Sequence, residues 1–177
     1  MSIGQDVCDV PLAMLTAETA ATLLYQEALY LDERLWDEWL ALYLLTARYW
    51  VPAWKSEGES TSDPDCEISL IYYESRAGLE DRIWRLKSGL SVASNPLRRT
   101  AHSVTNVLVS DASKPGEANV KATFNVGVFD PRRKTSHAFF GRYNYRLRHT
   151  PEGWRIAAKT ILLMNDNIPA VADIYML

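Results

Sequence analysis

The chain has 177 residues, 47% of them hydrophobic and 23% charged, with 19 Lys and Arg against 22 Asp and Glu and a formal net charge of −3. This length fits one domain that buries about 70% of the surface exposed by its unfolded chain. A net charge this close to zero argues against a protein that binds the phosphates of nucleic acid or an anionic membrane surface. We therefore expect no nucleic-acid partner.

The N-terminus, Met1–Asp6, lacks the basic start and the apolar core of a signal peptide. The longest apolar run, Trp39–Leu45, is far shorter than the ~20 residues that cross a bilayer. These features predict a soluble, cytoplasmic protein with no membrane partner. Cys8 and Cys66 have no partner motif near them, so we expect two free thiols.

The first part of the chain is predicted to be an arm followed by helices. Residues 1–15 show no sustained period and include Pro11, which predicts an extended arm ahead of a single domain over residues 16–177. Thr16 is a fair N-cap for a first helix. Its apolar stripe is Ala20, Leu23, Leu24, Ala28 and Leu31. A second helix is expected at once, with a stripe of Trp36, Trp39, Leu40 and Tyr43.

The middle of the chain mixes short strands and one more helix. Residues Arg48–Trp54 alternate weakly and predict a first strand, Lys55–Asp65 reads as a polar loop, and Glu67–Glu74 as a short strand. Gly78 is expected to open a third helix. The inner face of that helix would be Leu79, Ile83, Leu86 and Leu90. Pro96, after Ser94 and Asn95, then breaks the chain before the long strands.

The last sixty residues alternate large apolar with polar positions. One face of the first long segment carries Val120, Ala122, Phe124, Val126 and Val128. The next segment places Phe139, Tyr143, Tyr145 and Leu147 on one face and Phe140, Arg142, Asn144, Arg146 and Arg148 on the other. After a turn at 151–153 a third segment runs over Trp154–Met164. Helices followed by a meander of long strands predict an α+β fold, in which a curved antiparallel sheet wraps helices into a cone.

Five blocks of the sequence, in order, resemble the small, or β, subunits of Rieske-type aromatic-ring-hydroxylating dioxygenases. The blocks are Leu31-Asp32-Glu33-Arg34 with 36–40, Arg48-Tyr49-Trp50-Val51-Pro52, Arg76–Arg82 with Arg85 and Leu86, Arg99 and Thr100 with His102 and Asn106, and 154–157 with Lys159, Asn165-Asp166, Pro169 and Asp173-Ile174-Tyr175. The third and last blocks look most like the benzoate-type branch. Many relatives carry an acid near the end of the second helix, where this chain has Leu45 and Thr46.

The resemblance implies a fold, a function and partners. The fold would be the nuclear-transport-factor-2-like, or SnoaL-like, cone, and the chain would be a non-catalytic assembly subunit acting in aromatic compound catabolism. Three small chains would form a homotrimer within a hexamer with three large (alpha) chains, and a ferredoxin and reductase would act on the holoenzyme. The Rieske 2Fe-2S cluster and the mononuclear non-haem iron would be on the large subunit, with no cofactor or metal in this chain.

The positions of the Cys and His residues agree with a small subunit that binds no metal. A Rieske cluster needs two cysteines and two histidines in close pairs. Here Cys8 and Cys66 are far apart, and the histidines are dispersed at 102, 137 and 149. A facial triad of two histidines and a carboxylate remains open by count, although no spacing supports it.

The competing hypothesis is a stand-alone enzyme. Other cone-fold proteins are isomerases, dehydratases and cyclases with an Asp or His general base in the cavity. His102 and His137 fall on predicted strands and Asp32 near the entrance to the cone, so a His/Asp pair is conceivable. A strand histidine is more often a core or interface group than a base. The six tryptophans, with Tyr and Phe on the strands, would fill the cone if most of them face inward. A small-molecule binding protein is a third hypothesis.

Candidate interface residues follow from the strand pattern and the resemblance. One strand face carries Arg142, Arg146 and Arg148. Their positive charges repel one another unless carboxylates of a neighbouring strand or of a partner chain pair with them. Arg99, His102 and Asn106 form one resemblance block, in which Asn106 should share the strand face of His102 because the two positions differ by an even number. The apolar C-terminus, Ile174–Leu177 with Tyr175, is expected to be buried between protomers.

Overall fold

The computed structural model describes residues 14–89, 96–165, 168 and 172–177. The predicted arm therefore lies outside the described residues, apart from Met14 and Leu15. The helices are α1 (Ala17–Asp32), α2 (Trp36–Ala41), α3 (Arg76–Lys87) and the short 3-10 helix η2 (Ile174–Met176). The strands are β1 (Tyr43–Pro52), β2 (Trp54–Ser56), β3 (Glu59–Ser60), β4 (Ser69–Tyr73), β5 (Arg99–Asp111), β6 (Glu117–Asp130), β7 (Thr135–Thr150) and β8 (Gly153–Leu163).

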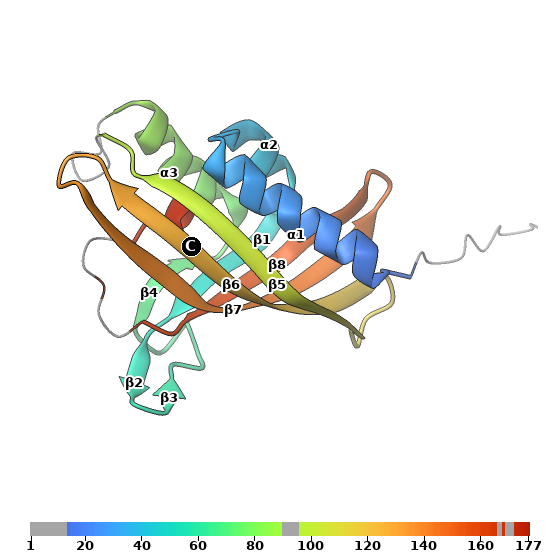
Figure 1. Ribbon diagram of the computed structural model, residues 1–177. Helices are drawn as coiled ribbons and strands as arrows, with labels where there is room; N and C mark the ends of the chain where they lie inside the picture. Colours follow the sequence, from blue (N-terminus) through green and yellow to red (C-terminus); the bar gives the residue numbers. More distant parts are fainter. Residues whose placement is uncertain (1–13, 90–95, 166–167, 169–171) are drawn as a thin grey trace, which may run out of the picture.

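The architecture is a curved sheet with helices in its hollow, which confirms the α+β cone (Figure 1). Six strands follow the order β4-β1-β8-β7-β6-β5, and β2 and β3 form a separate hairpin. All the pairings are antiparallel except that of β1 with β8. The sheet is open, with β4 and β5 as its edges. None of the described helices is long and apolar enough to cross a membrane.

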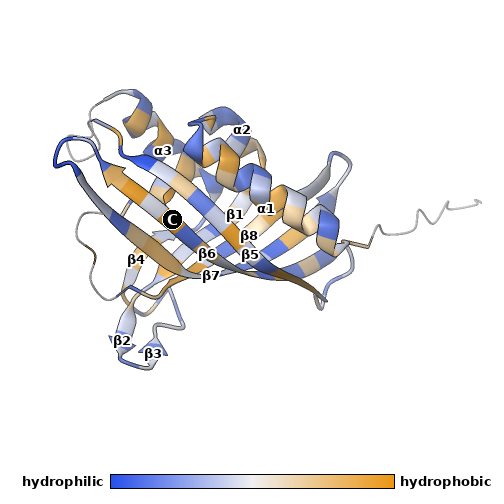
Figure 2. Ribbon diagram, in the orientation of Figure 1, coloured by the Kyte–Doolittle hydropathy of each residue, from blue (hydrophilic) through white to orange (hydrophobic). Residues whose placement is uncertain are grey.

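The predicted patterns place the long elements correctly. Thr16 caps α1, its hydroxyl accepting from the backbone N–H of Thr19 at 3.1 Å, and the apolar stripe of α1 packs over β5. Along β6 and β7 buried and exposed positions alternate as expected, because one face of the sheet meets the helices and the other does not. Figure 2 shows this alternation of hydrophobic and hydrophilic residues along the strands.

The prediction of a second helix reaching Tyr43 was wrong. The helix α2 ends at Ala41, and β1 begins at Tyr43, five residues before the expected start at Arg48. The chain joins the sheet there because the Leu42 carbonyl accepts from the Ile156 N–H of β8 at 2.8 Å. Leu45 therefore lies on a strand, 70% exposed, and not at a helix end. The polar segment predicted as a loop also contains the β2–β3 hairpin.

Gly78 does not open the third helix. The helix α3 begins at Arg76 with Ser75 as N-cap, and Gly78 lies in its first turn. A side chain at Gly78 would collide with the ring of Tyr73, so glycine is required there for α3 to approach β4 closely. Leu79, Ile83 and Leu86 face inward as predicted, whereas Leu90 lies outside the described residues.

Two irregularities in the long strands change which side chains face the interior. In β5 the register shifts between Thr105 and Leu108, and Asn106 is exposed with a φ of 54°. Asn106 therefore does not share the strand face of His102, because the extra residue of a bulge reverses the alternation. In β8 the register shifts at Ala157, which turns Lys159 toward the interior.

Candidate functional site

A carboxylate, Glu27, lies at the centre of the cone. It sits on the apolar stripe of α1 between Leu24 and Leu31, and is 2% exposed. Tyr145 donates its hydroxyl to Glu27 Oε2 at 2.6 Å, and Tyr43 donates to Oε1. The sequence analysis missed this residue. Its signal was a carboxylate three and four positions from leucines of one helical stripe, a placement that requires a buried partner.

The partner of Glu27 is Lys159, from the bulged strand β8. Its Nζ donates to Glu27 Oε1 at 2.9 Å and lies 4.2 Å from the centre of the Tyr143 ring. Both side chains of the ion pair are almost completely buried, at 1% and 2% exposure. The cation is therefore held by one carboxylate and the π-face of a tyrosine.

The pKa values reflect burial and mutual hydrogen bonding. Burial lowers the pKa of Lys159, and the charge and hydrogen bond of Glu27 offset only part of that effect. Burial alone would raise the pKa of Glu27, but the charge of Lys159 and the hydrogen bonds from the tyrosines outweigh it and lower the pKa. Burial, followed by the negative charge of Glu27, raises the pKa of Tyr43 and Tyr145 well above the usual value. Both phenols therefore stay protonated as donors. The network is a satisfied polar core, and its groups are already engaged with one another.

The C-terminal segment closes the cone from within. Ile174, Tyr175, Met176 and Leu177 are each at most 1% exposed. Asp173 anchors the segment by accepting from Arg82 Nε of α3 at 2.8 Å, and the Tyr175 ring meets Trp36 of α2 edge-on at 6.1 Å. These residues fill the interior of their own chain. The expectation that they are buried between protomers does not hold for this conformation.

The structure brings together two of the candidate catalytic residues, Asp32 and His102. Asp32 is the last residue of α1, and its Oδ1 lies 2.6 Å from His102 Nδ1. Its carboxylate also accepts from the His102 backbone N–H at 2.9 Å and from the Thr100 hydroxyl at 2.8 Å. Burial would raise the pKa of Asp32, but the hydrogen bonds from His102 and Thr100 outweigh it and lower the pKa. The pair fastens the end of α1 to β5.

His137 lies apart from that pair, on β7 opposite Val128. Its ring meets Phe139 edge-on at 5.0 Å, and burial, then the nearby charge of Arg98, lowers its pKa. The ring nitrogens Nε2 of His102 and His137 are both buried and have no hydrogen-bond partner among the described residues. A buried histidine in such surroundings is a packing group unless a substrate reaches it.

Three of the interface candidates, Arg142, Arg146 and Arg148, lie on the outer face of the sheet. Arg148 binds Glu117 at 2.7 Å, and Arg146 approaches the same carboxylate at 3.6 Å. Glu117, on the neighbouring strand β6, therefore forms ion pairs with two of the three arginines. Arg142 is exposed and has no ion pair with a described residue. Arg99 stacks its guanidinium over the Phe129 ring at 5.7 Å.

The donor set of the described residues does not fit an iron-sulfur cluster or a mononuclear iron. No group of three or more His, Cys, Asp or Glu side chains within residues 14–89, 96–165, 168 and 172–177 is arranged to hold a metal ion. Cys66 is exposed and free, and the Nδ1 of His102 is already engaged by Asp32. A Rieske centre needs paired cysteines and histidines.

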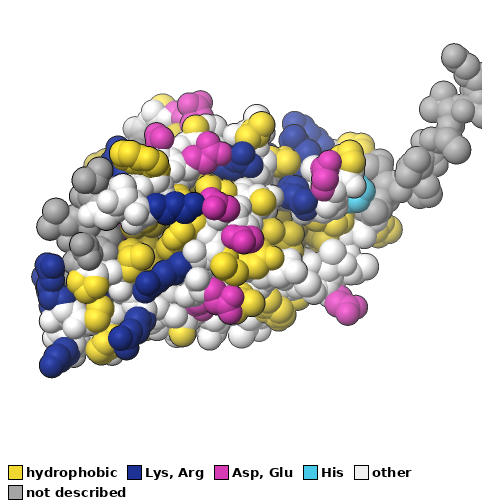
Figure 3. All heavy atoms as spheres, turned by 90° about the horizontal axis from the view of Figure 1, so that it is seen from above, with side chains coloured by type: hydrophobic (Ala, Val, Ile, Leu, Met, Phe, Trp, Pro, Cys, Tyr) yellow, Lys and Arg dark blue, Asp and Glu magenta, His cyan; other side chains and the backbone are white. Residues whose placement is uncertain are grey.

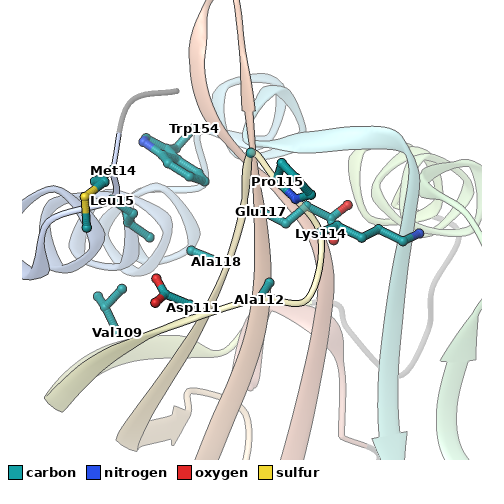
Figure 4. Close-up of a pocket in the computed structure, with 11 residues that line it drawn as sticks. Met14, Leu15, Val109, Asp111, Ala112, Lys114, Pro115, Glu117, Ala118 and Trp154 are labelled. Carbon is teal, nitrogen blue, oxygen red and sulfur yellow. The ribbon is translucent and has the colours of Figure 1, made fainter. Parts of the chain in front are cut away.

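A hollow at one end of the sheet offers no complete catalytic constellation among its described residues either. This hollow of about 220 Å³ lies where the start of α1, the β5–β6 turn and the start of β8 meet, and its lining includes Leu15, Val109 and Trp154 (Figure 4). Its described lining residues include no histidine, and Glu117 there is committed to the arginines. Over the helical face, acidic and basic side chains are interspersed, so neither sign dominates that side (Figure 3).

Only three of the six tryptophans are buried. Trp36, Trp39 and Trp154 face the interior, and Trp84 is 62% exposed on α3. The condition that most of the tryptophans face inward is therefore not met. The tyrosines around Glu27 and the C-terminal segment complete the filling.

Comparisons of the sequence and the structure show which known proteins this chain is similar to. A family model described as "Ring hydroxylating beta subunit" matches residues 26–170. The chain is 40% identical over 161 residues to benzoate 1,2-dioxygenase subunit beta of Acinetobacter baylyi, covering 91% of this chain and 94% of that protein. It is 39% identical to toluate 1,2-dioxygenase subunit beta of Pseudomonas putida, covering 89% and 96%. The solved beta subunit of benzoate 1,2-dioxygenase from Burkholderia mallei superposes with a TM-score of 0.76 at 31% identity, covering 93% and 99%.

Proposed function

This chain belongs to the family of ring-hydroxylating beta subunits, and from that membership we propose that it is the non-catalytic assembly subunit of an aromatic-ring-hydroxylating dioxygenase. Its relatives act in benzoate and toluate dioxygenases, which supports an aromatic acid as the substrate of the holoenzyme. The pocket for that substrate would belong to the large subunit.

The observation that carries the proposal is the filled cone. Glu27 and Lys159 bind each other at the centre of the interior, the phenols around them are protonated, and the chain's own C-terminus closes the space. A cone-fold enzyme needs an open cavity with a free acid or base, and here the central acid and base neutralise each other. The outer face of the sheet carries exposed charged groups that are available for interaction.

The partners follow from the same proposal. The large subunit would hold the Rieske cluster and the non-haem iron, since the described donors of this chain fit neither. Three small and three large chains would form the assembly, and a ferredoxin and reductase would supply electrons to it in the cytoplasm. Residues 16–177 would be one domain, and residues 1–15 an arm available to neighbouring chains.

The test uses the full chain alone and co-expressed with a Rieske-type large chain encoded beside it. Alone, the chain should contain no stoichiometric iron and should not hydroxylate benzoate-type acids. Together the two chains should co-purify, and both iron and activity should appear with the complex. Elemental analysis giving about one iron per isolated chain would overturn the proposal, because a mononuclear site would then be here.

A second candidate function rests on one specific observation, the Asp32–His102 pair. A histidine oriented by a carboxylate at 2.6 Å, with its second ring nitrogen free of described partners, has the form of a general base. If the chain is an isomerase, dehydratase or cyclase, His102→Ala should remove roughly 10²–10⁴-fold of a small-molecule activity and leave assembly intact. Reduced melting temperature and weaker large-subunit binding, without any activity to lose, would assign the pair to structure.

A further inference from the structure

The outer face of strands β5, β6 and β7 carries an excess of positive charge. The cross-strand register places Arg99, Lys121, Arg142, Arg146 and Arg148 on this face. Glu117 is the one acid among the outward positions of these three strands, and it is occupied by Arg146 and Arg148. Arg99, Lys121 and Arg142 have no ion pair with a described residue, and of these Lys121 and Arg142 lie nearer the centre of the face. We call this surface the basic face.

Around Arg142 the basic face is grooved and partly apolar. Its neighbours across the strands are Thr123 and Leu162, and small side chains such as Ser103 and Thr105 continue the same surface. A shallow groove of about 520 Å³ runs here between Phe140, 46% exposed, and Arg142, with Met164 at its border. Small residues let another backbone approach closely, and an exposed aromatic beside an unpaired arginine is typical of an interface centre.

The opposite charge is found on the same chain, in the segment Trp54–Glu67, which we call the acidic hairpin. It contains β2, β3 and the following loop, and it projects from the body beyond β4 (Figure 1). Its acids are Glu57, Glu59, Asp63, Asp65 and Glu67, against one cation, Lys55, which pairs with Glu59 and Glu67 and leaves the segment with an excess of negative charge. The hydrogen bond from Lys55, and then those from the Ser62 and Asp63 backbone, lower the pKa of Glu67 to about 2, so it stays negative.

We propose that the acidic hairpin of one copy of this chain docks on the basic face of a second copy, with Glu57 and Glu59 at its tip facing Arg142 and Lys121. Within one chain no ion pair joins these two surfaces among the described residues. The complementarity is therefore available to a neighbouring molecule.

The geometry of such a contact also fits a closed ring. Hairpin and basic face are different surfaces of the chain, so the contact is heterologous, and a heterologous contact repeated around a closing rotation generates a ring. This inference rests on the proposed function only in requiring that copies of the small subunit assemble with one another. Beyond that requirement, it specifies that the acidic hairpin meets the basic face and that opposite charges determine this pairing.

The experiment is a charge exchange read by sedimentation of the full-length chain over a range of concentrations. Arg142→Glu alone, and Glu57→Lys with Glu59→Lys, should each raise the dissociation constant of the assembly about tenfold or more, because like charges then face each other. Combining all three substitutions should restore much of the affinity. Lys121→Glu provides a second reversal on the basic face.

The matched control is Arg132→Glu, an exposed cation of the β6–β7 turn outside both surfaces, which should leave assembly unchanged. Melting curves should show each variant folded, since the changed side chains are exposed.

Normal assembly of the charge-reversed variants, or loss of assembly that the combined substitutions do not rescue, overturns the inference. An Arg142→Glu protein that assembles normally but fails to bind the large chain assigns the basic face to that subunit. A monomeric wild-type chain contradicts both this inference and the assembly part of the proposed function.

Discussion

The two faces of β6 and β7 show how one pair of strands serves two purposes. Toward the helices these strands present Phe124 and Tyr143, whose rings stack at 4.1 Å, and Tyr145, which binds Glu27. On the other side the same strands present Lys121 and Arg142, exposed. The inner face is therefore expected to determine stability, and the outer face to determine association, since only exposed groups are available to another chain.

The strongest test of that comparison is Lys159→Met. It leaves the Glu27 carboxylate buried without its cation, and we expect a loss of about 3–5 kcal/mol in the free energy of unfolding. Replacing both, as Glu27→Leu with Lys159→Met, should recover part of the loss, although Tyr43 and Tyr145 then lack their acceptor. Urea unfolding at one protein concentration measures this. A single variant as stable as wild type would show that the interior is not the stabilising face.

A substitution in the C-terminal segment should cause the next largest loss in the free energy of unfolding. Met176→Ala removes a side chain that is 1% exposed and leaves a cavity at the mouth of the cone. We expect a loss of about 2–5 kcal/mol, as for other buried Met-to-Ala changes. The same unfolding measurement applies. A loss below 1 kcal/mol would mean that the segment leaves the interior easily and is free to contact partners, as the sequence had suggested.

His102→Ala is expected to have an intermediate effect. It removes the side-chain donor to Asp32 while Thr100 and the backbone N–H remain, so the cost should be about 1–3 kcal/mol. A thermal melt gives the loss, and reconstitution with the large chain gives the effect on assembly. His149→Ala, on β7 beside the turn to β8, is a matched control and should change little.

Acid should weaken the inner face. The folded-state pKa of Glu27 lies below its ordinary value of 4.5, so its contribution to stability is fully present above that pH and is lost as the pH falls through the folded value. The loss should approach about 1.4 kcal/mol per pH unit from this group. Stability measured from pH 7 to pH 3, in wild type and in the Glu27→Leu, Lys159→Met variant, separates this group from the others. Equal slopes would refute the assignment.

The smallest effect is expected on the outer face. Arg148→Gln removes an exposed partner of Glu117 and should change the stability of the folded chain by about 0–1 kcal/mol. A larger loss at constant assembly would show that the outer ion pairs also stabilise the monomer, and the difference between the two faces would then be smaller than we infer.

Local patterns in the sequence were sufficient for the long elements. The Thr16 cap and the leucine stripe define α1, and the alternation along β6 and β7 assigns each side chain to a face, because periodicity records which side meets the core. The family blocks also identified the chain, which the matched family model confirms over residues 26–170. Alternation fails only where a strand gains a residue, as at Asn106 and Ala157.

The tertiary structure decided which charged groups meet. The sequence contained Asp32 and His102, and it contained Glu27 and Lys159, but these pairs are 70 and 132 residues apart along the chain. Lys159 reaches Glu27 because a bulge in β8 turns it inward, and Tyr43 joins them because α2 ends at Ala41 and β1 begins at Tyr43 beside β8. Contacts over such separations depend on register and packing of the whole fold, which no local pattern encodes, and they determine that the cone is filled.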